Sequence, residues 1–391
     1  MLERIAQKKA SGQGFSFAGR NKSKKQAREV FDLMKQERLQ RLLQGMKTAA
    51  MPQLLVSDPA SLYYLTGQWF SPGERMLALY VSLEQAPLLF LNELFPLQEE
   101  IGIEIVRFDD TQDAVAEVAE RVRKDCLMGV DKNWPARFLL RLMELGGGSR
   151  FVNGSPLLDR LRMRKDQEEI TLMRAASRVN DRAMQHLLEL IPQELSEKAM
   201  ARQLLDIYEG LGAQGFSFTP IVAYGAHAAD PHHKTGTGTV RTGDCVLFDV
   251  GCKKDSYCAD MTRTVFYRQV TPLGRKVYET VLEANRRAIA AVKPGVRFCD
   301  IDAAARQIIE AAGYGANFTH RTGHSIGLET HDFGDVSAVN TEAVQPGMIF
   351  SIEPGIYLPG QLGVRIEDLV LVTDDGCEVL NAYPKELTIV E

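Results

Sequence analysis

Four acidic residues stand inside or at the ends of apolar, strand-like segments of this chain. Asp249 and Glu353 each end an apolar run, Asp260 precedes one, and Glu367 lies between two. A charged carboxylate that is buried without a partner costs several kcal/mol. Each acid must therefore find its own cationic side chain, or all four must converge on a bound cation. Because four such acids occur together, the sequence favours one shared polar site.

The spacing of these acids predicts two β-hairpins that face one cavity. Asp249 and Asp260 are eleven residues apart across a short turn, and Glu353 and Glu367 are fourteen apart. Neighbouring antiparallel strands can direct both acids of a pair to the same face. A histidine flanked by glycines, His324, is the fifth side chain that we expect in this cavity.

The residue types at this site indicate a metal centre. Histidine is scarce, with seven residues in all, and six of them lie between residues 227 and 331. Neutral imidazole is the commonest metal ligand and a ready acid or base. Four carboxylates and one imidazole suffice for two neighbouring divalent ions when two carboxylates bridge them. An oxygen-rich set without thiolate favours Mn²⁺, Co²⁺, Zn²⁺ or Fe²⁺.

Length and composition exclude several classes of protein. The chain has 391 residues, 45% of them hydrophobic and 25% charged, which predicts two or three globular domains rather than a fibrous or disordered chain. It contains no apolar window of the roughly 18 residues that a membrane span needs. The net charge of −5 argues against broad nucleic-acid binding. Six cysteines without a CxxC pair predict packed thiols in a cytoplasmic protein.

Residues 1–33 form a basic leader, with eight Lys and Arg residues against three acids. This leader lacks the apolar segment of a secretory signal. It is polar and poor in periodic apolar residues, so we expect disorder or a loosely attached helix. Met34 opens the first convincing helix, which favours a translation start at Met34 over a transit peptide. We assign the leader no function.

Strands and helices alternate between residues 34 and 158, which predicts an α/β domain with a mixed or parallel sheet. A charged connector without a turn cluster places the domain boundary near residues 155–162. The expected helices cover residues 34–48 and 114–124, and the expected strands cover 53–56, 76–82, 87–91 and 127–130.

Residues 159–391 combine runs of helices with runs of antiparallel strands. This pattern predicts an α+β domain in which helices cover a curved antiparallel sheet. In the segment 274–291, apolar residues recur at steps of three and four and form one helix face. The expected helices are 167–190, 196–212, 274–291 and 300–312, and the expected strands are 245–250, 262–267, 348–353 and 365–372.

The chain resembles the Xaa-Pro peptidases, prolidase and aminopeptidase P, of the pita-bread metallopeptidase family. The resemblance implies a pita-bread catalytic domain over 159–391, a creatinase/prolidase-type domain over 34–158 that begins with a matching segment at 57–67, and a homodimer. The matching catalytic segments are 231–233, 247–251, 259–264, 320–328, 331–332, 346–357 and 363–373.

The resemblance also implies two divalent ions, with Mn²⁺ as the first candidate and Co²⁺, Zn²⁺ or Fe²⁺ as alternatives. Asp249 would hold one ion, and Asp260 and Glu367 would bridge both. His324 and Glu353 would complete the coordination of the second ion.

A metal-bridging hydroxide would then attack the scissile carbonyl, and Glu353 would carry its proton to the leaving nitrogen. His331 would stabilise the tetrahedral oxyanion, and His232 would contact the bound peptide near the scissile bond. Arg365 would pair with a substrate carboxylate, or, with equal weight, form a salt bridge to one of the two bridging acids. The remaining histidines of this part of the chain are candidates for hydrogen bonds that orient the metal-ligating side chains. They are His227, His233 and His320.

Three functions follow from this resemblance. The leading hypothesis is hydrolysis of the Xaa–Pro bond at the amino terminus of dipeptides or short peptides. The alternative is a hydrolase or lyase of the same fold that acts on a small non-peptide substrate, as creatinase-like and ectoine-hydrolase-like relatives do. Creatinase departs from the ligand pattern that this chain keeps. A protein-binding module without activity is disfavoured because the site is complete.

Overall fold

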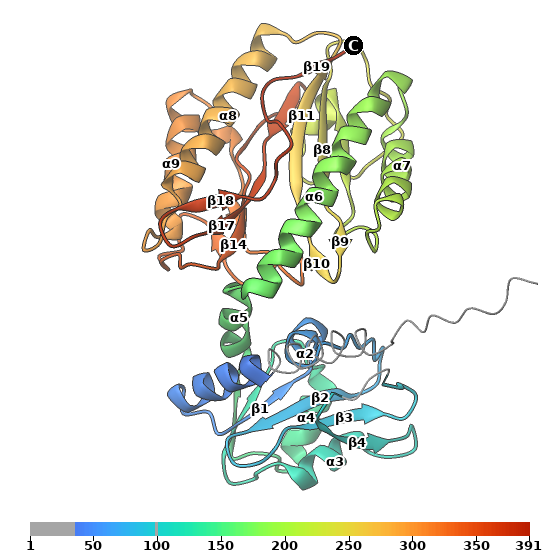
Figure 1. Cartoon of the computed structure of the whole chain (residues 1–391), viewed down its shortest axis with the longest axis vertical. Coiled ribbons are helices and arrows are strands. Elements are labelled where there is room, and N and C mark those ends of the chain that lie inside the picture. Colours follow the sequence, from blue (N-terminus) through green and yellow to red (C-terminus); the bar gives the residue numbers. More distant parts are fainter. Residues whose placement is uncertain (1–35, 98–100) are drawn as a thin grey trace, which may run out of the picture. The chain divides into compact units, whose positions relative to one another are not determined.

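The computed structural model describes residues 36–97 and 101–391 and divides the chain into two compact units. One unit ends at Leu157, and the other runs from Leu158 to Glu391 (Figure 1). The basic leader of residues 1–33 lies outside the described residues, so its expected disorder stays a prediction. Within the described ranges, none of the helices is both long and apolar enough to span a lipid bilayer.

The N-terminal unit contains a six-stranded mixed sheet in the order β4-β3-β2-β1-β5-β6. Strand β1 lies inside this sheet and is buried along its whole length, as its unbroken apolar sequence predicts. The predicted α/β class is confirmed. The strands are β1 (Gln53–Val56), β2 (Leu77–Ser82), β3 (Leu88–Asn92), β4 (Glu104–Phe108), β5 (Leu127–Val130) and β6 (Arg150–Asn153). The helices are α2 (Pro59–Thr66), α3 (Ala114–Arg121), α4 (Ala136–Glu144) and one that covers residues 36–48.

The long helices of the second unit lie close to their predicted positions. Helix α6 begins with a capping box, in which Asp166 and Glu169 each accept a hydrogen bond from the other's backbone N–H. The apolar face of α8 is buried, as its spacing predicts. Helix α5 (Ser155–Met163) includes the boundary between the two units. The helices within the second unit are α6 (Gln167–Leu190), α7 (Glu197–Gly210), α8 (Pro272–Ala291) and α9 (Phe298–Ala311), with 3₁₀ turns η1 (Ile191–Gln193), η2 (Gly225–Ala229) and η3 (Gly315–Asn317).

The strands of this unit form one four-stranded sheet, one three-stranded sheet and three short two-stranded pairs. The four-stranded sheet has the order β19-β11-β8-β7, and β17 lies between β14 and β18. The strands are β7 (Ile221–Tyr224), β8 (Cys245–Val250), β9 (Lys253–Lys254), β10 (Tyr257–Cys258), β11 (Met261–Tyr267), β12 (Gly323–His324), β13 (Asp335–Val336), β14 (Ile349–Ile352), β15 (Gly355–Leu358), β16 (Leu362–Arg365), β17 (Asp368–Val372), β18 (Cys377–Val379) and β19 (Ile389–Val390).

Side-chain alternation along β8 connects the sheet to two hydrophobic cores. Val246 and Phe248 belong to the core that contains residues of α6 and α7. Cys245 and Leu247 belong to the core that contains residues of α8 and α9. Because successive residues of a strand point to opposite faces, Asp249 lies on the same face as Cys245 and Leu247.

The predicted strand 365–372 is wrong in one respect, because the chain changes partners inside it. Strand β16 ends at Arg365 and pairs with β15, whereas β17 begins at Asp368 and pairs with β14. Between them, the N–H of Glu367 donates to the carbonyl oxygen of Thr262 on β11 at 3.1 Å. The apolar sequence reads as one run because both strands are buried.

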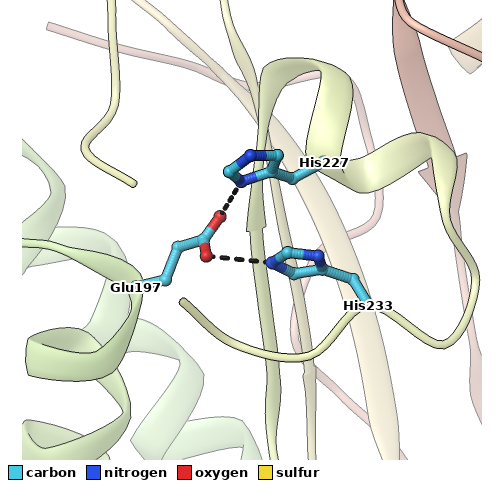
Figure 2. Close-up of side chains that lie close together, drawn as sticks. All are labelled: Glu197, His227 and His233. Atoms are coloured by element: carbon cyan, nitrogen blue, oxygen red, sulfur yellow. Dashed lines mark hydrogen bonds and ion pairs between the residues drawn. The ribbon is translucent and has the colours of Figure 1, made fainter. Parts of the chain in front are cut away.

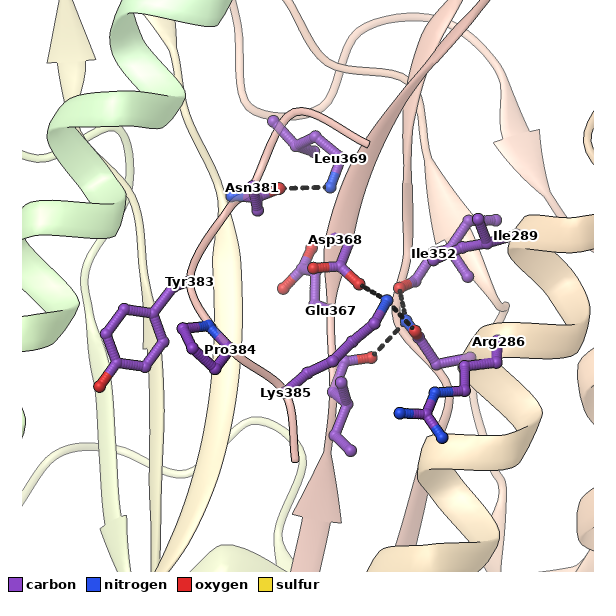
Figure 3. A network of polar contacts seen from close by, with 12 residues as sticks. Arg286, Ile289, Ile352, Glu367, Asp368, Leu369, Asn381, Tyr383, Pro384 and Lys385 are labelled. Carbon is purple, nitrogen blue, oxygen red and sulfur yellow. Dashed lines mark hydrogen bonds and ion pairs between the residues drawn. The ribbon is translucent and has the colours of Figure 1, made fainter. Parts of the chain in front are cut away.

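A buried polar network connects the segment 381–385 to β11 and β17, the strands that begin directly after Asp260 and Glu367 (Figure 3). Arg263 on β11 donates to the carbonyl oxygen of Glu367 at 2.6 Å and to Oδ1 of Asp368 at 2.7 Å. Lys385 Nζ donates to Oδ2 of Asp368 at 2.5 Å and to Oδ1 of Asn285 on α8 at 2.8 Å. The network thus joins β11, β17 and α8 behind the candidate site.

Lys385→Met should lower the free energy of unfolding by about 2 kcal/mol, because it leaves part of the charge of Asp368 buried without a partner. The loss is smaller than for a fully buried pair, since a fifth of the Lys385 side chain is exposed. Arg286→Met is the matched control, because its ion pair with Glu386 is exposed and should contribute less than about 0.5 kcal/mol. Equal urea midpoints for the two variants would contradict this account.

Candidate metal centre

The predicted site residues meet around one cavity of about 500 Å³ in the C-terminal unit. All five proposed ligands lie in its wall, and so do both proposed catalytic histidines and Arg365. The polar lining residues are Asp249, Asp260, His324, Glu353, Glu367, His232, His320, His331, Arg321, Thr330 and Arg365, and the apolar ones are Phe218, Ile221 and Pro231.

The register of the two strand pairs brings the four acids together. On β8 and β11, Asp249 lies directly opposite Thr262, and Asp260 precedes β11 on the same alternating face as Thr262. On β14 and β17, Ile352 lies opposite Asp368. Glu353 and Glu367 are the next residues beyond this pair, so both leave the three-stranded sheet at the same end.

Two of the acids are buried with one oxygen unsatisfied. Asp260 is 3% exposed and Glu367 is 1% exposed. Neither Oδ1 of Asp260 nor Oε1 of Glu367 has a hydrogen-bond partner among the described residues. Burial raises the pKa of both carboxyl groups well above the usual range, and the other acids of the cavity add to the rise. Such oxygens are expected where a cation completes the site.

The imidazole of His324 is oriented toward these acids. Its Nδ1 lies 3.2 Å from the carbonyl oxygen of Ser325, which only accepts hydrogen bonds, so Nδ1 carries the proton and Nε2 has the lone pair. Nε2 lies 3.7 Å from Asp260 Oδ2 and 3.4 Å from Glu353 Oε1. Burial lowers the pKa of His324 to about 4, which keeps the ring neutral, as a metal ligand requires.

Ligand atoms of Asp260, His324 and Glu367 all lie within 4.8 Å of one another. Asp249 and Glu353 line the same cavity. The donor set is oxygen-rich with one imidazole, and its two orphaned oxygens are buried. The residues present therefore fit divalent cations of the kind that prefer carboxylate and imidazole ligands.

Arg365 forms its ion pair with Asp249 rather than with either of the predicted bridging acids. Its Nη2 donates to Asp249 Oδ2 at 2.5 Å, and its Nε donates to Thr262 Oγ1 at 3.2 Å. Thr262 in turn donates its hydroxyl proton to Glu367 Oε2 at 2.7 Å. The predicted salt bridge of Arg365 is thus present, but its partner is Asp249 and not Asp260 or Glu367. The reason is that β16, which ends at Arg365, contacts β8, which carries Asp249.

Tyr357 is a site residue that the sequence analysis did not single out. It lies on β15, and its hydroxyl accepts a hydrogen bond from Arg365 Nη1 at 2.7 Å. The same hydroxyl lies 2.8 Å from His320 Nε2. His320 Nδ1 lies 2.7 Å from the carbonyl oxygen of Arg321, so Nε2 is left to accept the hydroxyl proton. The sequence does not mark Tyr357, because it reads as one residue of a short apolar strand.

The two histidines with predicted catalytic roles are both exposed, but they have different neighbours. The ring of His331 contacts that of His324 edge-on, with centroids 4.3 Å apart. Partial desolvation of the ring, together with the neighbouring His324, lowers the pKa of His331 to about 4. His232 is exposed, and its backbone N–H donates to Asp230 Oδ1 at 2.9 Å. Their catalytic roles stay predictions.

His227 and His233 do not lie behind the ligands. Both contact Glu197, a buried acid that the sequence analysis did not single out (Figure 2). These three side chains form a second group of potential metal ligands. No sequence signal marks Glu197, since its partners lie 27 to 39 residues away along the chain.

The cysteines near two of the acids are packing residues, as predicted. Cys245, Cys252 and Cys258 are buried and free. Burial raises the pKa of the Cys245 and Cys252 thiols to about 12 and that of Cys258 to about 11. Thiols in this state are poor metal ligands and poor nucleophiles.

Comparisons with known proteins agree with this arrangement. Residues 171–374 match the family model of metallopeptidase family M24, and residues 38–164 match that of the creatinase/prolidase N-terminal domain. An uncharacterized peptidase of Staphylococcus saprophyticus is 33% identical over 89% of this chain and 100% of its own length.

Two solved structures are similar over most of the chain. A dipeptidase from Pyrococcus horikoshii is 34% identical, with a TM-score of 0.84 over 90% of this chain and 99% of the other. An Xaa-Pro dipeptidase from Bacillus anthracis is 30% identical, with a TM-score of 0.84 over 91% and 99%. The chain therefore belongs to metallopeptidase family M24 and is a metal-dependent peptidase that carries a creatinase/prolidase N-terminal domain.

Proposed function

We propose that the protein hydrolyses the Xaa–Pro bond at the amino terminus of dipeptides or short peptides. The observation that carries the proposal is that Asp260 and Glu367 each bury an oxygen without a hydrogen-bond partner among the described residues, and that ligand atoms of both acids lie within 4.8 Å of one of His324. The substrate class is supported by relatives that are named as a dipeptidase and an Xaa-Pro dipeptidase.

The five ligands would hold two divalent ions, with Mn²⁺ preferred, in the division that the family resemblance implies. Bound divalent ions would polarise the scissile carbonyl and lower the pKa of a coordinated water toward neutrality. The ligands are Asp249, Asp260, His324, Glu353 and Glu367.

The remaining roles belong to side chains of the cavity wall. Glu353 would accept a proton from the attacking water and deliver it to the leaving nitrogen. His331 would donate to the developing oxyanion, and His232 would orient the peptide. Arg365 would bind a substrate carboxylate only by exchanging one of its present partners. Arg321, whose ion pair with Asp335 is long at 3.9 Å, offers a second cation for that carboxylate.

The finer assignments belong to the same proposal. Residues 34–158 would form the N-terminal domain and residues 159–391 the catalytic domain, in a cytoplasmic homodimer. Support comes from the two family matches, which cover residues 38–164 and 171–374, and from six free cysteines.

The test is a paired assay on metal-loaded protein, with Leu-Pro, a Leu-Pro-containing tripeptide and Leu-Ala as substrates. We expect cleavage of Leu-Pro and no cleavage of Leu-Ala. Cleavage of the dipeptide alone would identify a dipeptidase, and cleavage of the tripeptide as well would identify an aminopeptidase P-like enzyme. Asp260→Asn, purified in parallel, controls for contaminating peptidases. Turnover of neither Leu-Pro substrate by metal-bound protein would reject the proposal in favour of a small non-peptide substrate.

A further inference from the structure

Glu197 is a fully buried carboxylate outside the candidate metal centre. It is the first residue of α7 and is 0% exposed. Its side chain faces the segment 224–238, which includes η2 and connects β7 to the chain before β8. Figure 2 shows the carboxylate beside the two stacked imidazoles of His227 and His233, with one oxygen toward each ring.

The composition of this cluster suggests a metal site, but the carboxylate already has four hydrogen-bond partners in the structure. Oε1 accepts from His227 Nδ1 at 2.7 Å and from the N–H of Tyr224 at 3.2 Å. Oε2 accepts from His233 Nε2 at 2.9 Å and from the N–H of Gly236 at 2.7 Å. A carboxylate offers about four lone-pair positions, and these four donors occupy all of them. The cluster is therefore a set of hydrogen bonds that holds the segment 224–238 against the start of α7.

Glu197 is favoured in its ionised form, which can accept all four of these hydrogen bonds. Burial alone would raise its pKa, but the hydrogen bonds from His233 and His227 outweigh burial and lower it. The start of α7 also favours a negative side chain. The backbone of the helix adds two further bonds, from the N–H of Glu197 to the carbonyl oxygen of Gly238 and from the N–H of Lys198 to that of Gly236.

The clamped segment carries part of the cavity wall. Pro231 and His232 line the cavity, and His232 is followed directly by His233, whose ring Glu197 holds. The N–H of His233 also donates to the carbonyl oxygen of Asp230 at 3.1 Å, which tightens the turn at His232. Because His232 itself is exposed, its direction depends on this neighbouring residue.

We propose that Glu197 is the positioning residue for His232, because it holds both ends of the segment that carries this histidine against α7. This inference rests on the proposed function, in which His232 contacts the substrate. Catalytic contacts tolerate little displacement, and a shift of about 1 Å can cost up to about 100-fold in rate.

Glu197→Gln tests the proposal. The amide keeps one acceptor oxygen, but its NH₂ group replaces the other oxygen and would face two N–H donors, with which it cannot form hydrogen bonds. We expect faster hydrogen exchange in residues 224–238, unchanged metal content, and a kcat/KM on Leu-Pro that falls about 10- to 100-fold. In a His232→Ala background, the same substitution should have almost no further effect on kcat/KM, since Glu197 acts through His232.

Glu169→Gln is the matched control. Glu169 is also buried in the first turn of a helix, and it accepts from the N–H of Asp166 at 2.9 Å and from the hydroxyl of Tyr257 at 3.0 Å. This variant should leave exchange in residues 224–238 unchanged and kcat/KM within about twofold. If Glu197→Gln does not fold, His233→Phe removes one of the four donors and keeps the stacking with His227.

Three results would overturn the proposal. These are unchanged exchange in residues 224–238, an equal loss of kcat/KM in the wild-type and His232→Ala backgrounds, and loss of a bound ion from Glu197→Gln, which would make the cluster a metal site. If the wild-type protein does not cleave Leu-Pro, the proposed function fails by itself. Hydrogen exchange and metal content then decide whether Glu197 holds the segment.

Discussion

Glu353→Gln should stop turnover and leave the fold intact. Glu353 faces the cavity, with its side chain 15% exposed, and its Oε1 accepts from the hydroxyl of Ser351 at 3.1 Å. Glutamine has nearly the same shape and can still accept this bond, but it cannot take up and release a proton. Loss of a general acid–base group costs about 10²- to 10⁴-fold. We expect kcat on Leu-Pro to fall by this factor.

The metal content must be measured on the same samples, because Glu353 is also a proposed ligand. If Glu353→Gln loses a bound ion together with its activity, the result would assign Glu353 to metal binding alone. A fully loaded Glu353→Gln enzyme with more than a tenth of the wild-type kcat would exclude proton transfer by this residue. Glu378→Gln is the control, since Glu378 pairs with Arg174 near the surface and should leave kcat unchanged.

Removing the metal should make the protein less stable as the pH rises. Burial and mutual repulsion raise the pKa values of Asp260 and Glu367 in the folded state. Below their unfolded pKa values of about 4, both groups are protonated in both states and carry no penalty. As the pH rises toward the folded pKa values, the unfolded chain loses its protons first, so unfolding becomes more favourable.

This prediction is checked by the melting temperature of metal-free protein between about pH 5 and pH 7.5. Added Mn²⁺ at 100 times its Kd should restore about 2.7 kcal/mol for each independent site. Asp260→Asn is the control, because it removes one of the two ionisations and should flatten the dependence on pH. A metal-free protein whose stability rises over this range would contradict the placement of the two acids.

Much of the site could be predicted from the sequence because strand geometry is local. Residues in a strand alternate with a period of two, so an acid that interrupts an apolar run reveals which face is polar. The pairing of β8 with β11 then places Asp249 opposite Thr262. The same reasoning places Glu353 and Glu367 together, although the chain changes strand partners at residues 366–367, between β16 and β17.

The remaining features depend on contacts between distant segments. Arg365 pairs with Asp249, 116 residues away, and the sequence offered three other acids that were equally charged. Glu197 begins a helix whose polar residues resemble those of any exposed face, and its burial comes only from the segment 224–238. Tyr357 reads as an ordinary strand residue until His320 and Arg365 are seen at its hydroxyl.

The balance of charge in the cavity wall implies an order of binding. Four carboxyl groups face two arginines, Arg321 and Arg365. Because burial favours the protonated forms of Asp260 and Glu367, the charges of the metal-free cavity nearly cancel, and the cavity attracts the carboxylate end of a peptide only weakly. Two divalent cations would displace the protons of Asp260 and Glu367 and would still leave the cavity with a net positive charge, so the same walls would then attract an anion. The same cavity would thus bind metal first and peptide afterwards. Metal-free protein would then not compete with metal-bound protein for the peptide substrate.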